Sequence, residues 1–165
     1  MITLEPITQQ NAMFFREVRL RALQDTPTAF GSTYAKESNF TDAEWVRRAA
    51  QWNGERSCAY LAMDERTPCG ILGGFLEQED ASRAGLISMW VSPSHRRQGV
   101  GALLVNALFS WARTRGARVM QLMVTCNNDA AIKFYQRLGF VLTGRTEPYP
   151  NDPLLVEYEM SMPII

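Results

Sequence analysis

One amphipathic segment, set between two apolar runs, limits the fold more than any other feature of the sequence. From Val100 to Trp111 the apolar side chains recur at the spacing of a helix that buries one face, and Gly116 ends the pattern. The runs at residues 86–91 and 119–124 have the character of strands, and the second is apolar enough for burial on both faces. A strand, a helix and another strand in this order favour a parallel strand pair.

The rest of the chain predicts a mixed α/β domain. Thr41 and Glu44 form a capping box at one helix start, and Gly139 has the C′ position that ends another helix. In chain order we expect a strand at 2–6, helices at 13–23 and 42–52, strands at 58–63, 70–76 and 86–91, a helix from 100, a strand at 119–124, a helix from 128, and strands at 140–145 and 154–160. We therefore expect one domain over residues 1–165, a mostly antiparallel sheet with a splayed parallel pair and helices on both faces.

Composition excludes several functional classes. Lys plus Arg and Asp plus Glu both total 17, and a chain without net charge lacks the basic excess that nucleic-acid and membrane-surface binders use. An odd set of cysteines without CxxC spacing predicts reduced thiols in a cytoplasmic protein, and a single histidine argues against a metal site. No segment is apolar for long enough to span a bilayer.

The loop between residues 91 and 101 carries the strongest chemical signal. Gly99 and Gly101 let backbone N–H groups approach a ligand at a helix start, and Arg96 and Arg97 add charged donors. The residues alone allow a phosphate cradle or an ordinary helix-start turn with solvated arginines. The loop lacks the Gly-Lys-Ser/Thr of a Walker sequence, and Leu104 replaces the third glycine of a dinucleotide fingerprint.

Two motifs together resemble a known family. Arg96-x-x-Gly99-x-Gly101 follows a strand that ends in Val91-x-Pro93, and about 25 residues later the chain reads NDAAIKFYQRLGF from Asn128. In order and spacing these motifs resemble the GNAT superfamily of acetyl-CoA-dependent N-acetyltransferases. The resemblance extends from the first strand to the last, and implies the GNAT fold with acetyl-CoA as cosubstrate and no metal.

The resemblance implies a set of cofactor-binding residues. Loop amides would bind the CoA pyrophosphate, the preceding strand would pair with the pantetheine arm and polarise the thioester carbonyl, and Asn128 would hydrogen-bond that arm. Tyr135 would lie near the thioester sulfur. The expected residues are Met89, Trp90, Val91, Arg96, Arg97, Gln98, Gly99, Val100, Gly101, Ala102, Asn128 and Tyr135.

The catalytic residues are less well determined. A Tyr135 hydroxyl near sulfur can protonate the leaving thiolate, although its helical position also suits a core aromatic. Many relatives carry an acidic base on the strand before the loop, but residues 86–91 include none. Glu77 or Glu79 acting through water, Ser88 as a relay, or solvent itself remain as alternatives, and solvated strand-end residues are the ordinary interpretation of both glutamates.

The expected function is acetyl transfer to a primary amine of a small molecule or a peptide N-terminus, directly within a ternary complex. The alternatives are a catalytically silent acyl-CoA-binding or sensing module and an O-acetyltransferase. The acceptor should contact residues 26–40, 77–84 and 147–153, with candidates Tyr34, Glu37, Glu79 and Tyr149. Acetyl-CoA and the amine are the expected partners, without nucleic acid or membrane; homodimers are common in the family, and the sequence does not determine the assembly.

Overall fold

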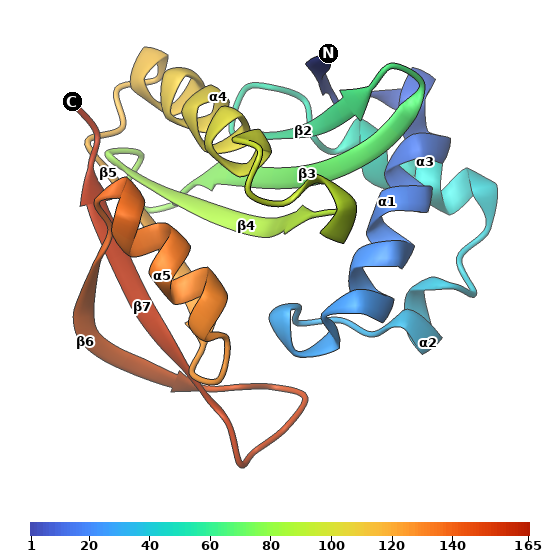
Figure 1. Ribbon diagram of the computed structural model, residues 1–165. Coiled ribbons are helices and arrows are strands. Elements are labelled where there is room, and N and C mark those ends of the chain that lie inside the picture. The colour runs from blue at the N-terminus through green and yellow to red at the C-terminus, as the bar shows by residue number, and fades with distance from the viewer.

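A single seven-stranded sheet organises the protein, described over residues 1–165 by a computed structural model (Figure 1). The strands are β1 (Ile2–Pro6), β2 (Ser57–Asp64), β3 (Thr67–Leu76), β4 (Arg83–Val91), β5 (Val119–Thr125), β6 (Val141–Pro148) and β7 (Val156–Pro163). Their order is β1-β2-β3-β4-β5-β7-β6, and only β4 and β5 run parallel. The predicted mixed, mostly antiparallel sheet is confirmed.

Helices cover both faces of this sheet, as predicted. They are α1 (Ala12–Asp25), α2 (Tyr34–Glu37), α3 (Asp42–Ala50), α4 (Val100–Thr114) and α5 (Asp129–Leu138). Helices α4 and α5 pack on one face in a core with Leu72, Leu86 and Leu122, whereas α1 and α3 pack on the other with Leu61 and Ile71. The short α2 was not predicted. No helix combines the length and apolar character that crossing a membrane requires.

The parallel pair separates after four residues. Its register runs from Arg83 opposite Val119 to Leu86 opposite Leu122 and stops there. Just beyond, β4 holds one extra residue relative to β3, and Ser88 within this bulge has a left-handed φ of 58°. A bulge bends its strand, so β4 turns away from β5 and residues 87–91 lack a neighbour on that side.

Strand β5 corrects one prediction. Met120, Leu122 and Val124 are buried, but the alternating Val119, Gln121 and Met123 are only partly buried. Burial on both faces was therefore the wrong expectation. The apolar core under α1 and α3 includes residues of β2, β3 and β4 but none of β5 or β7. That face of β5 is consequently left open to form the wall of a cavity.

Candidate active site

Six consecutive backbone amides at the start of α4, from Arg97 to Ala102, donate to no group in the protein. The first helical amide with a partner is that of Leu103, which donates to the Gly99 carbonyl at 3.0 Å. Gly99 is the N-cap, with a left-handed φ of 82° and open space around it. Unpartnered N–H groups at the positive end of a helix dipole favour an anion.

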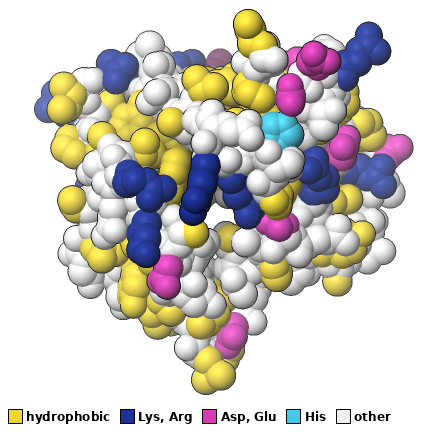
Figure 2. Space-filling view, in the orientation of Figure 1, with side chains coloured by type: hydrophobic (Ala, Val, Ile, Leu, Met, Phe, Trp, Pro, Cys, Tyr) yellow, Lys and Arg dark blue, Asp and Glu magenta, His cyan; other side chains and the backbone are white.

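The two arginines of this loop differ in their contacts. Arg97 is exposed and makes no ion pair. Arg96 donates from Nε to the Val91 carbonyl at 2.9 Å and from Nη2 to Asp25 Oδ2 at 2.6 Å, so its guanidinium joins β4 to the end of α1. Figure 2 shows cationic side chains gathered along the upper rim of a hollow in the centre of this face.

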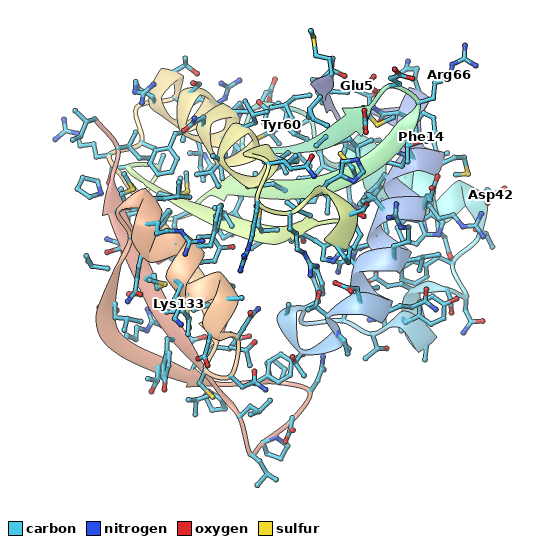
Figure 3. The ribbon with its side chains drawn as sticks, viewed as in Figure 1. Glu5, Phe14, Asp42, Tyr60, Arg66 and Lys133 are labelled. Carbon is cyan, nitrogen blue, oxygen red and sulfur yellow. The ribbon has the colours of Figure 1, made fainter.

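Helix α5 lies close to the start of α4. A Cβ on Gly101 would come within 2.9 Å of Phe134 and 3.1 Å of Met89, so only glycine permits this approach without a shift. Lys133, on the same helix as Phe134, is exposed (Figure 3). The loop amides, α5 and the free edge of β4 are thus brought together at one end of the separated strands.

Helix α5 also places Asn128 and Tyr135. The Asn128 Oδ1 caps the helix by accepting the Ala131 N–H at 3.2 Å, which leaves its side-chain NH₂ group available. The Tyr135 ring is buried edge-on against Phe134 and Phe140, and its hydroxyl has no hydrogen-bond partner in the protein. Burial raises the pKa of Tyr135 above its ordinary value, which keeps the hydroxyl protonated.

A cavity of about 490 Å³ lies on the open face of the sheet. Its apolar walls include Phe30, Phe75, Ile87 and Met123. Its charged lining residues are Arg19, Glu77, Arg145, Glu147, Glu157 and Glu159. Such a volume and mixed lining are typical of a site for a small molecule.

The carboxylates that line the cavity differ in their contacts. Arg145 pairs with Glu147 at 2.7 Å and with Glu159 at 3.4 Å. Glu77 accepts a hydrogen bond from the Gln121 side chain but has no cationic partner. The Glu157 side chain makes no hydrogen bond or ion pair, and burial, followed by the charge of Glu147, raises its pKa.

Comparison with known proteins decides the family. The profile of the Acetyltransferase (GNAT) family matches residues 20–140. An uncharacterised N-acetyltransferase of Methanocaldococcus jannaschii is 40% identical over 151 residues, covering 84% of this chain and 60% of that protein. This chain belongs to the GNAT family.

Solved structures agree on the GNAT fold. A GNAT-family acetyltransferase from Streptococcus pneumoniae superposes with a TM-score of 0.86 at 20% identity, covering 100% of both chains. A protein from Salmonella typhimurium, described as an acetyltransferase and solved with its cofactor acetyl-CoA, has a TM-score of 0.81 at 17% identity over 100% of this chain and 95% of its own. The chain spans about half the length of the curated relatives it matches, from 44% to 60% in two cases.

The residues of this GNAT chain fit acetyl-CoA. The amides of residues 97–102 suit a pyrophosphate, because each has an unused donor and Gly99 leaves open space before them. The β4 edge beyond Leu86 suits an extended arm that carries amide groups, because no strand occupies it. The side chain of Trp90, in contrast, is buried beside α1 and donates to Asp25 Oδ2 at 3.0 Å, which leaves only its backbone for the cofactor.

The other candidate residues from the sequence lie in different parts of the folded GNAT domain. Glu77 lines the cavity, whereas Glu79 is exposed in the following turn and does not. Glu37 is 1% exposed within ion pairs, and the buried Tyr149 donates its hydroxyl to the Phe30 carbonyl at 2.5 Å. Tyr34 is exposed and also lies outside the cavity lining. Of these five residues the fold brings only Glu77 to the cavity, and Ser88, the candidate relay, lines it as well.

Sequence reasoning missed four charged cavity residues, namely Arg19, Arg145, Glu157 and Glu159. Glu157 and Glu159 alternate with Tyr158 and Met160 along β7, so the period of two indicated that both carboxylates share one face. Nothing in the sequence identified that face as the cavity. Arg19 gave no signal beyond its position in the amphipathic α1.

Proposed function

We propose that this chain transfers the acetyl group of acetyl-CoA to a primary amine of a small molecule, directly within a ternary complex. The observation that carries the proposal is the pairing of two sites beside the β4–β5 separation. Unpartnered amides and α5 lie on one side, and the cavity with its carboxylates lies on the other sheet face. An activated acetyl group and an amine can meet through that separation.

Each expected cofactor residue has a proposed task. The amides of residues 97–102 bind the pyrophosphate, with Arg97 adding charge and Arg96 supporting the loop from the side. The backbone of Met89, Trp90 and Val91 pairs with the pantetheine arm. Asn128 donates to that arm from the NH₂ group that capping leaves free.

The reaction requires proton removal from the amine, stabilisation of charge on the carbonyl oxygen and proton delivery to sulfur. Acetyl-CoA supplies an acetyl group activated as a thioester. A backbone N–H of residues 89–91 donates to the carbonyl oxygen as negative charge develops there. Tyr135, protonated and without a partner, delivers its proton to the departing sulfur.

Glu157 is the proposed general base. It lines the cavity, no protein group occupies its oxygens, and its raised pKa makes it a better proton acceptor than an ordinary glutamate. Glu77, which the sequence suggested for this task, is held by Gln121 and instead provides negative charge for a cationic acceptor. Glu79 has no proposed role.

Two measurements on the wild-type chain test this function. Acetyl-CoA binding is measured by calorimetry, and release of CoA thiol is measured across a panel of primary amines. We expect binding together with amine-dependent thiol release. Tight binding without turnover on any amine would overturn the proposal and favour the silent acyl-CoA-binding module.

A further inference from the structure

One wall of the cavity carries a buried positive charge that its own ion pairs do not balance. Arg19 donates from Nε and Nη2 to Glu37, each at 3.0 Å, and Arg48 donates to the same carboxylate at 2.9 Å. The side chains of Arg19 and Glu37 are only 9% and 1% exposed. Two guanidinium groups share one carboxylate, so a net positive charge remains.

Arg19 brings this charge to the cavity. It lines the cavity together with Ser88 and donates to the Ser88 hydroxyl from Nη1 at 3.3 Å, while the Phe30 ring lies 4.9 Å from its guanidinium carbon. A guanidinium has five N–H donors, and these contacts use three. The remaining donors and the Ser88 hydroxyl suit a carboxylate.

Two other carboxylates that line the cavity, those of Glu77 and Glu157, have no cationic partner. Glu77 is fixed at the level of Gln121, and Glu157 lies opposite Thr125 on the neighbouring strand. Gln121 and Thr125 are four residues apart on β5, which corresponds to roughly 13 Å along a strand. The carboxylates are therefore two separate points of attraction for cations.

We infer that the acceptor is a free diamino acid, whose carboxylate binds Arg19 and Ser88 and whose two amino groups lie at Glu157 and Glu77. This inference rests on the proposed function. The charges match in sign, because one positive charge remains beside Arg19 whereas Glu77 and Glu157 are carboxylates without a cationic partner. A peptide N-terminus lacks a free carboxylate beside its amine and leaves Arg19 without this partner.

These groups account for the bonds and protons of the acetyl transfer. The amino group arrives at Glu157 as an ammonium ion and gives one proton to that carboxylate, and its nitrogen then forms the new C–N bond to the acetyl carbon. The nitrogen loses its second proton to solvent as the C–S bond breaks, and Glu157 afterwards returns its proton to solvent. The sulfur takes a proton from Tyr135, which is replenished from solvent. The products are an N-acetylated diamino acid and CoA thiol.

The wild-type chain tests the inference directly. L-Lysine and L-ornithine are compared with their amides, which lack the carboxylate, with 1,5-diaminopentane, and with L-norleucine, which lacks the second amine. For the better of the two diamino acids we expect kcat/KM at least tenfold above that of each control. Equal or faster turnover of an amide or of the diamine overturns the inference but leaves the function standing. Failure of every amine overturns the function itself.

A matched pair of variants tests the role of Arg19 in binding the acceptor carboxylate. Arg19→Gln and Arg16→Gln each remove one cation from α1, but only Arg19 lines the cavity, whereas Arg16 pairs with the exposed Asp42. Arg19→Gln should reduce the preference for the acid over its amide to less than twofold, whereas Arg16→Gln should keep it. The preference is a ratio, so partial loss of folded protein does not alter it. An undiminished preference for the acid in Arg19→Gln, or an equal loss of that preference in both variants, contradicts the assignment of the acceptor carboxylate to Arg19. If Arg19→Gln does not fold, the comparison of substrates with the wild-type chain decides.

Discussion

Glu157 faces Glu147 directly across the β6–β7 pair, and both side chains line the cavity. Arg145 pairs with Glu147 at 2.7 Å, but no cation pairs with Glu157. Like charges opposite one another across a strand pair are unfavourable, as is partial burial of a lone carboxylate. This cost is consistent with a functional residue, because a base must keep its oxygens free for the acceptor.

Replacing Glu157 with Gln should lower turnover by about 100-fold or more, which is the usual contribution of a general base. Thiol release at saturating acetyl-CoA measures the effect. Glu17→Gln is the matched control, because Glu17 is exposed on α1 and outside the cavity. Wild-type turnover in Glu157→Gln would remove Glu157 from the mechanism and return the role to Glu77 or solvent.

The same substitution should stabilise the protein at neutral pH. Because the pKa of Glu157 is raised in the folded state above the ordinary 4.5, the ionised carboxyl disfavours folding once the pH exceeds that value. Urea unfolding at pH 7 should therefore show a higher midpoint for Glu157→Gln than for the wild type, and the difference should disappear below pH 4. A lower midpoint at pH 7 would indicate a stabilising contact for the ionised carboxylate.

Tyr135→Phe should lower kcat by roughly 10- to 100-fold, within the usual range for loss of a catalytic proton donor. The Kd for acetyl-CoA should change less than about twofold, because the hydroxyl has no partner and the ring packing is retained. Tyr60→Phe on β2 is the control (Figure 3). An unchanged kcat in Tyr135→Phe would leave the residue with a packing role alone.

Gly99→Asp should weaken acetyl-CoA binding by at least tenfold, because it places a negative charge before the unpartnered amides. Gly99→Asn has nearly the same shape without the charge and should bind more tightly than Gly99→Asp. Gly54→Asp controls for backbone strain, since Gly54 also has a left-handed φ, of 84°, and open surroundings. Calorimetry measures the affinity for acetyl-CoA. Equal affinity in the Asp and Asn variants at position 99 would argue against an anion site.

Glu37→Gln should destabilise the fold by about 3–5 kcal/mol, the usual result of removing one partner from a buried ion pair. Burial alone would raise the pKa of Glu37, but hydrogen bonds from Arg19 and Arg48, together with the charge of Arg19, lower it to about 2. A lowered carboxyl pKa contributes stability that is lost as the pH falls from about 4.5 toward 2. Acid unfolding over that range should be steeper in the wild type than in Glu37→Gln, and parallel curves would contradict the assignment.

Local patterns in the sequence predicted the parts that depend on near neighbours. The apolar spacing from Val100 to Trp111 specified α4, and Thr41 with Glu44 forms the predicted capping box of α3. The predicted helix-start loop places its free amides as expected, because the first turn of any helix leaves N–H groups without partners. Helical and strand periods together also identified the parallel pair and its crossover.

Contacts between distant segments decided the rest. The sequence of β5 does not reveal that α1 and α3 leave one of its faces uncovered, and so its burial on one side only was not predicted. Nor does it show that Glu157 from the last strand reaches the same cavity as Arg19 from the first helix.

By itself, the sequence determined the order of the elements, the GNAT motifs and the position of the glycine loop before α4, because each follows from residues close together in the chain. Only the tertiary structure decided which carboxylates line the cavity. Glu77 and Glu79 are two residues apart, yet one lines the cavity and the other faces solvent in the turn. That choice depends on where β4 leaves β5 and which helices cover the sheet, and both are set by packing between segments far apart in sequence.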